Sequence, residues 1–166
     1  MKRPLLETEN CIVKIPDYSD AALLLDFYLK NKTNFESWEP KRNSEYYSLT
    51  FCQSQICDAI QLFIDKQAVK MIAITKDNSQ IIAVCNFNNI VWGCFCACHL
   101  GYAIDKSYEG KGIMYEIIKA GINYMHNDFK MHRIMANHMP NNLRSAKLLN
   151  KLGFIKEGYA KDYLKI

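Results

Sequence analysis

The run Glu109-Gly110-Lys111-Gly112-Ile113-Met114 follows a strand-like segment that ends at Ile104 and opens a helix-like segment that begins near Gly112. A turn with glycines at alternate positions gathers several backbone N–H groups in one small concavity. The positive end of the helix dipole strengthens the attraction of this concavity for an anion. The run therefore indicates a phosphate-bearing ligand, although this spacing alone more often marks a simple turn or helix start.

Composition narrows the class of protein. The chain has 166 residues, of which 49% are hydrophobic and 23% charged, and its formal net charge is +4. This profile is typical of one globular domain, and the modest positive charge suits an anionic ligand such as a nucleotide or CoA. We see no basic block interleaved with aromatic residues, no signal peptide and no apolar run of membrane-spanning length. We therefore expect neither a nucleic-acid partner nor a membrane partner.

The cysteines indicate the compartment. There are seven, an odd number, and none forms a Cys-x-x-Cys pair, so we expect reduced thiols in the cytoplasm. Cys94, Cys96 and Cys98 alternate, which would place them on one face of a strand. A metal site needs ligands from several elements, so we interpret the three as small hydrophobic residues on a buried face and expect no metal.

Strand-like and helix-like periods follow the order β, α, α, β, β, β, α, β, α, β. Apolar residues recur in steps of three and four from Leu49 to Phe63, which predicts a helix, and the turn at residues 77–79 predicts a hairpin. We find no repeat and no linker, so we expect a single α+β domain over residues 1–166 with a mixed sheet. The expected strands span residues 11–15, 71–75, 80–88, 92–104, 133–139 and 154–164, and the expected helices residues 21–30, 44–63, 112–129 and 142–152.

Helix boundaries are marked in two places. Asp17 is in the position of an N-cap, with Asp20 three residues later in the position of a capping box. Gly153 follows the last expected helix as a C-terminal cap. These signals indicate that the first and last helices are specified locally.

Two common phosphate-binding signatures are absent. The chain lacks both the P-loop pattern and the Gly-x-Gly-x-x-Gly pattern of dinucleotide-binding folds. The segment from Met139 to Phe154 instead places Asn142 and Ser145 at the start of a helix, where they could meet a ligand. The alternative for both is ordinary helix capping.

Several short segments together resemble the GNAT acyltransferase superfamily. They are Gly110-x-Gly112, Asn142-x-x-Ser145 and Lys151-Leu-Gly-Phe154-x-x-Glu157-Gly158. Within the superfamily the chain resembles the RimJ-type ribosomal-protein-alanine N-acetyltransferases from about Phe35 to Ile166. The segments that carry this closer resemblance are Phe35-x-x-Trp38-Glu39-Pro40-x-Arg42, Asn86-Phe87-x-Asn89, Leu100-Gly101-Tyr102, residues 131–137 and residues 157–164.

The resemblance implies the GNAT fold, a mixed and mostly antiparallel sheet flanked by helices, with acetyl-CoA as the acetyl donor. It implies that the strand at residues 100–104 splays from the strand at residues 133–139. It places the pantetheine arm along the backbone of Tyr102 and Ile104 and against Asn142. The pyrophosphate would lie on the backbone amides of Gly110, Lys111, Gly112, Ile113 and Met114. Glu109 departs from the family's Gln or Arg, and a carboxylate near a pyrophosphate is electrostatically unfavourable. Lys111 and the helix dipole would offset it if Glu109 points to solvent.

The resemblance also suggests catalytic groups. Ser145 matches the residue that donates a proton to the departing thiolate. Some relatives carry a Glu as general base at the position of Leu164, and Asp162, two residues earlier, would share its strand face. We therefore take Asp162 as the candidate base, with His99 and Glu39 as competitors and a solvated carboxylate as the alternative role of Asp162.

The acceptor side is less defined. Trp38 and Glu39 would shape the acceptor pocket, or Trp38 would simply anchor the loop. The implied activity is direct acetyl transfer, in a ternary complex, to the N-terminal alanine amine of a ribosomal protein, with the fifth small-subunit protein favoured. A different amine acceptor, or acyl-CoA binding without turnover, is the alternative. The oligomeric state stays open.

The resemblance carries one expectation about the C-terminus. Relatives continue beyond the position of Ile166 with a further strand that pairs between the last two strands of the sheet. We therefore expect the final strand of the fold to be missing, which would leave strand edges unpaired.

Overall fold

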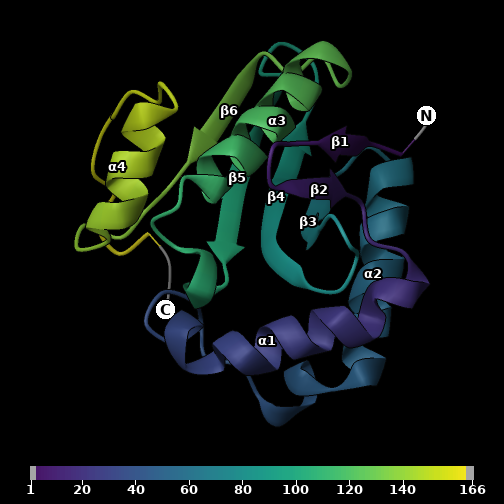
Figure 1. The fold of residues 1–166 in the computed structure, drawn as a ribbon. Coiled ribbons are helices and arrows are strands. Elements are labelled where there is room, and N and C mark those ends of the chain that lie inside the picture. Colours follow the sequence, from purple (N-terminus) through teal and green to yellow (C-terminus); the bar gives the residue numbers. More distant parts are fainter. Residues whose placement is uncertain (1–2, 164–166) are drawn as a thin grey trace.

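The computed structural model describes residues 3–163. In this part of the chain six strands form one sheet in the order β1-β2-β3-β4-β5-β6, with four α-helices around it (Figure 1). Neighbouring strands are antiparallel except β5 and β6, which are parallel because α3 crosses between them. The strands are β1 (Leu5–Glu7), β2 (Cys11–Lys14), β3 (Val69–Thr75), β4 (Ile81–Val91), β5 (Ala97–Ile104) and β6 (Arg133–Ala136). The helices are α1 (Ala21–Phe35), α2 (Leu49–Ile64), α3 (Ile113–Asn127) and α4 (Leu143–Lys151), with short 3₁₀ helices η1 (Tyr18–Asp20), η2 (Ser44–Tyr47) and η3 (Lys106–Tyr108).

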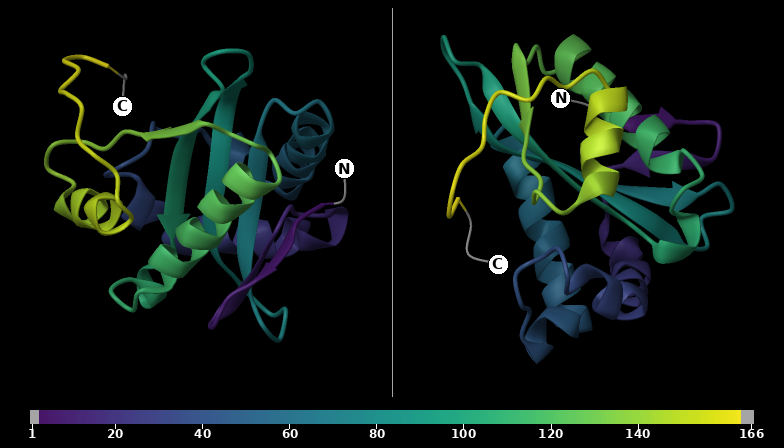
Figure 2. Two further views of the ribbon diagram at one scale, coloured as in Figure 1. Left: turned by 90° about the horizontal axis from the view of Figure 1, so that it is seen from above. Right: turned by 90° about the vertical axis from the view of Figure 1, so that its left-hand side faces the viewer.

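Different helices cover the two faces of the sheet (Figure 2). On one face α3 buries Ile117 in a cluster with Phe87 of β4. On the other face Leu24 of α1 and Ile56 of α2 lie in a second cluster with Ile72 of β3. Burying a side chain of this size stabilises a fold by about 1.5–3 kcal/mol. None of the helices within residues 3–163 is long and apolar enough to cross a membrane.

The glycine turn sets the start of α3. Gly110 has φ of +74° and Gly112, the N-cap residue of α3, has φ of +81°. This left-handed conformation costs an L-residue about 1–2 kcal/mol, a cost that glycine avoids. A Cβ atom added at either glycine would meet nothing within 4 Å. The turn therefore needs glycine for its backbone conformation and not for space.

Both expected cap signals are confirmed. The Asp17 carboxylate accepts a hydrogen bond from the Ser19 backbone N–H, and the Asp17 N–H donates to Asp20 at 2.8 Å, which completes a capping box at η1 directly before α1. Gly153 has φ of +88°, and the following N–H, that of Phe154, donates to the Leu149 carbonyl at 3.0 Å. Local sequence therefore determines these two helix ends.

The expected strand at residues 92–104 starts later than predicted. β5 begins at Ala97, because residues 92–96 form the turn of the β4–β5 hairpin. The prediction that the three cysteines share one buried strand face is therefore wrong for Cys94 and Cys96. Cys94 is exposed, and Cys96 is half-buried with φ of +39°. Cys98 is buried, and this burial, with a smaller contribution from Cys96, raises the pKa of its thiol to about 12. No three His, Cys, Asp or Glu side chains within residues 3–163 gather as a possible metal site.

The two ends of the chain differ from expectation. β1 pairs with β2, although a three-residue strand leaves too short a pattern to be predicted. The prediction of a strand at residues 154–164 is wrong for residues 154–163, which form no strand. Leu164 lies outside the described residues. Residues 154–163 pair with none of the six described strands, and residues 155–163 are exposed. An ion pair between Glu157 and Arg133 ties it to β6.

A buried polar network joins α1 to the segment after β5. Asn31 and Asp105 are each 2% exposed, and the Asn31 amide donates to Asp105 at 3.2 Å and accepts from the Lys106 N–H at 3.1 Å. The Lys30 ammonium lies 2.7 Å from Asp105. Burial alone would raise the pKa of Asp105, but the hydrogen bonds from Lys30, the Ser107 backbone and Asn31 outweigh it and lower that pKa.

Replacing Asp105 by Asn should destabilise the fold by about 2 kcal/mol at neutral pH, because a paired buried charge is lost. Because the pKa of Asp105 is lower in the folded than in the unfolded state, its carboxylate stabilises the fold at pH values above the unfolded-state pKa of about 4. This stabilisation is lost as the pH falls through the folded-state pKa. The difference between wild type and Asp105→Asn in urea unfolding should therefore be full at pH 6 and shrink below pH 4. Asp58→Asn, on the exposed side of α2, is the matched control and should change the free energy of unfolding little. A difference between wild type and Asp105→Asn that is as large at pH 3 as at pH 6 would contradict a stabilising role of the Asp105 charge.

Replacing Gly112 by Ala should lower the free energy of unfolding by about 1–2 kcal/mol, because alanine is strained at this φ. Gly158→Ala is the matched control, since Gly158 has open space around it and no left-handed φ. Thermal and urea unfolding of both variants measure the effect. Equal stability of the two variants would show that the turn tolerates a side chain.

Candidate active site

β6 pairs with only the first half of β5. The paired residues run from Ala97 opposite Arg133 to Leu100 opposite Ala136, where β6 ends. β5 continues to Ile104 and stays paired with β4 along its other edge. The expected divergence of the two strands is confirmed. We call the side of residues 101–104 that faces away from β4 the open edge of β5.

The register shows which backbone groups lie along the open edge. The Asp105 N–H donates to the Ile82 carbonyl at 2.8 Å, so these two residues form a hydrogen-bonded pair of the β4–β5 ladder. Such pairs alternate with pairs whose N–H and C=O groups point outward. Tyr102 and Ile104 occupy the outward-pointing positions. Their backbone groups are therefore free of the β4–β5 ladder and point to the open edge.

The glycine turn presents donors at the start of α3. The side chains of Ile113 and Met114 are buried at 7% exposure each, which anchors the turn in the core. The first N–H groups of a helix have no preceding turn to bond to. Lys111 is exposed, with its ammonium 5.4 Å from the centre of the Tyr108 ring. The turn thus offers an anion backbone donors, the helix dipole and one nearby cation.

The Glu109 carboxylate does not lie free in solvent but is bound by side chains of α1 and α4. Its side chain is 24% exposed and forms an ion pair with Arg144 of α4. The Asn34 amide of α1 donates to its other oxygen at 3.2 Å. The negative charge at the mouth of the turn is therefore balanced by Arg144. This pair also joins α4 to the turn.

The start of α4 brings Asn142 and Ser145 to β5. The Asn142 side chain caps the helix by accepting the Ser145 N–H at 3.1 Å, as the capping alternative predicted. The Ser145 hydroxyl lies 2.7 Å from the Tyr102 hydroxyl, a hydrogen bond from α4 to β5. The structure therefore places Ser145 next to a residue of the open edge, and Asn142 one helical turn before it.

Burial raises the pKa of Tyr102 above its usual value of 10, although the hydrogen bond with Ser145 acts in the opposite direction. The Tyr102 phenol therefore stays protonated at physiological pH. It can donate to the Ser145 oxygen, which leaves the Ser145 proton free to point elsewhere. The pair can thus direct a hydroxyl proton toward a group bound at the open edge.

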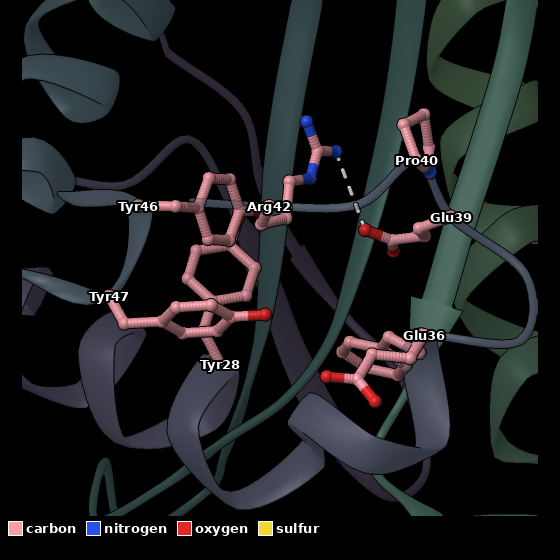
Figure 3. A pocket seen from close by; sticks show the side chains of 8 residues that line it. Tyr28, Glu36, Glu39, Pro40, Arg42, Tyr46 and Tyr47 are labelled. Carbon is pink, nitrogen blue, oxygen red and sulfur yellow. Dashed lines mark hydrogen bonds and ion pairs between the residues drawn. The ribbon is translucent and has the colours of Figure 1, made fainter. Parts of the chain in front are cut away.

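The loop with Trp38 and Glu39 follows α1 and borders a small cavity of about 20 Å³ (Figure 3). Trp38 is 40% exposed and so is no buried anchor. Glu39 lines the cavity and accepts from Arg42 at 3.4 Å, and Arg42 in turn lies 4.6 Å from the centre of the Tyr46 ring. Burial raises the pKa of Tyr28 and of Tyr46, so the phenols of this wall stay neutral.

A larger cavity of about 320 Å³ was not predicted. It lies between the sheet and the helices α1 and α2, and shares Tyr28, Arg42 and Tyr46 with the small cavity. Its floor carries polar side chains on strands that are otherwise apolar: Lys70 on β3 and Asn86 and Asn88 on β4. Polar residues at alternate positions of such strands were the signal available in the sequence.

The three candidate bases come from separate segments. Asp162 lies in an exposed turn with φ of +52°, so the shared strand face with Leu164, on which its assignment depended, is absent from the described residues. His99 lies on β5, with a buried Nδ1 atom that has no hydrogen-bond partner in the described part of the chain. Glu39 is held by Arg42. No hydrogen bond or ion pair in the described part of the chain joins any of the three to Ser145, so the structure does not favour one candidate base over the others.

Comparison with known proteins agrees with this architecture. Residues 12–155 match the acetyltransferase (GNAT) domain family. The chain is 41% identical over 161 residues, covering 97% of its length and 83% of the relative, to the ribosomal protein uS5-alanine N-acetyltransferase of Escherichia coli K12. The ribosomal-protein-S5-alanine acetyltransferase structure from Vibrio fischeri superposes with a TM-score of 0.93 at 34% identity, over 97% of this chain and 88% of that one.

A more distant structure shares the fold. Mycobacterium smegmatis RimJ in complex with CoA-disulfide has a TM-score of 0.89 at 21% identity, over 99% of this chain and 80% of that one. The diverging strands, the glycine turn and the family match lead to one assignment. This chain belongs to the GNAT acetyltransferase family.

Proposed function

We propose that this protein transfers the acetyl group of acetyl-CoA to the N-terminal alanine amine of a ribosomal protein. The observation that carries the proposal is the open edge of β5 beside Ser145, because acyl transfer needs both a place for the thioester and a donor for its leaving group. The 41% identity to the E. coli uS5-alanine N-acetyltransferase supports the choice of acceptor. A role for Trp38 and Glu39 at the acceptor end is part of the same proposal.

In this proposal the glycine turn and the open edge hold the cofactor. The amides of residues 110–114 receive the pyrophosphate, helped by the dipole of α3 and by Lys111. The backbone of Tyr102 and Ile104 pairs with the amide groups of pantetheine as an added strand would. Asn142 still has amide donors free for the same arm, because its capping bond uses only its oxygen.

The chemistry follows from this placement. The neutral amine attacks the thioester carbonyl, so that a C–N bond forms, the C–S bond breaks and CoA leaves as a thiolate. Ser145 gives its proton to the thiolate and is reprotonated from solvent, which has received the amine proton, while the Tyr102 phenol donates a hydrogen bond to the Ser145 oxygen. The proton lost by the amine goes to solvent, directly or through Asp162, His99 or Glu39. A terminal amine with a pKa of about 7.7–8.0 needs no strong base.

Ser145→Ala should lower kcat by about a hundredfold, the lower end of general acid catalysis, and leave the KM for acetyl-CoA nearly unchanged. Ser54→Ala, on the exposed side of α2, is the matched control and should behave as wild type. The rate at which the CoA thiol is released from acetyl-CoA in the presence of an alanine-starting peptide gives kcat and KM for both variants. Equal kcat values in the two variants would remove Ser145 from the mechanism.

The same assay tests the acceptor. Turnover with alanine-starting peptides supports the proposal, and turnover only with other amines would assign a different acceptor. Binding of acetyl-CoA without any turnover would assign a binding protein. Failure to bind acetyl-CoA in calorimetry would refute the cofactor as well.

The pH dependence of kcat/KM should report the acceptor and not the protein. Activity should rise with pH up to about 8 as the terminal amine loses its proton. It should then stay level to about pH 10, because burial raises the pKa of Tyr102. Steady-state rates from pH 6 to 10 test this, and a second ionisation near pH 9 would contradict a protonated Tyr102.

A further inference from the structure

Two polar residues of the cavity floor, Lys70 and Asn86, belong to a row of residues that crosses three strands. Lys70 of β3 lies opposite Asn86 of β4, and Asn86 lies opposite Gly101 of β5. Residues directly opposite in a sheet project from the same face, so this row lies on the face covered by α1 and α2. Two residues away along β4 and β5, Asn88 lies opposite His99 on that same face. The row therefore leads from the cavity to the open edge of β5.

Gly101 leaves the end of the row uncovered. It lies between Leu100, the last residue paired with β6, and Tyr102. A Cβ atom added at Gly101 would meet nothing within 4 Å, so space is free above its backbone. A chain whose amine is at the open edge can therefore extend over Gly101 toward Asn86 and Lys70.

The charge of the cavity has one sign. Its lining residues include Lys70 and Arg42 and, among residues 3–163, no Asp or Glu. Arg42 is already paired with Glu39. Lys70 has no ion pair with any residue that the structure describes. A half-buried cation without a counter-charge, placed in a cavity, is suited to an anionic group of a ligand.

The neighbouring amides strengthen this reading. Asn86 and Asn88 are half-buried, and neither side chain forms a hydrogen bond within residues 3–163. Two residues away on the same face, Ile72 and Val84 are apolar and pack under α1 and α2. The face of the sheet under α1 and α2 thus changes from apolar to polar side chains at the cavity between the sheet and these helices. Amide donors beside a lysine are the groups that bind a carboxylate.

We propose that this cavity binds an acidic side chain near the N-terminus of the acceptor, with Lys70 as the residue that determines this preference. The inference rests on the proposed function, because it takes the acceptor amine to be at the open edge. Strands lie about 4.8 Å apart, so Lys70 is about 10 Å from β5. An extended chain advances about 3.4 Å per residue, which places the acidic residue at the second to fourth position of the acceptor.

The test uses alanine-starting peptides that carry Glu, Gln or Lys at the second, third or fourth position. For wild type, Glu at one of these positions should lower the KM about tenfold relative to Gln, the effect of one charge-assisted hydrogen bond, with kcat unchanged. Lys70→Gln should abolish the preference. Lys70→Glu should reverse it in favour of the Lys peptide.

Lys76→Glu is the matched control, because Lys76 is exposed in the β3–β4 turn, and it should keep the wild-type preference. Thermal unfolding of both Lys70 variants checks that each is folded. Equal KM values for all peptides in wild type would overturn the acidic subsite and leave the proposed function intact. Absence of acetylation of every peptide would refute the proposed function, and the subsite with it.

Discussion

The site depends on one constraint in the sheet: β6 pairs with β5 over four residues and then ends. A parallel neighbour can reach β5 only through a crossover, and here the crossover is the glycine turn and α3. The feature that opens the edge of β5 therefore also brings the N-terminus of a helix to the same end of the sheet. Strand divergence and anion site are two results of one connection.

Polar contacts hold the turn between two helices. From α1, Asn31 bonds to Asp105 and Lys106, and Asn34 bonds to Glu109. From α4, Arg144 pairs with Glu109. Glu109 differs from its counterpart in the family, but this pairing offsets the repulsion that a carboxylate would exert on a phosphate. The departure from the family pattern is thus compensated by residues far away in the sequence.

Local patterns predicted much of this arrangement. The long periodic helices, the caps at Asp17 and Gly153 and the divergence after Leu100 were all confirmed, because each is specified by short-range spacing or by family motifs. The strand expected at residues 154–163 failed because a strand forms only with a partner, and alternation in one segment does not supply one. The large cavity was missed because Lys70, Asn86 and Gly101 form a row only once the register of three strands is known.

The helix α1 serves both ends of the site. Near its C-terminus Asn31 and Asn34 contact the segment that contains the glycine turn, and the loop with Trp38 and Glu39 begins immediately after it. A helix transmits displacement along its axis as a rigid body. A change in its position on filling either end would therefore alter the affinity of the other end, and thermodynamic linkage requires that effect to be equal in both directions. A thermodynamic coupling between the two substrate sites would thus act through the attachment of a single helix.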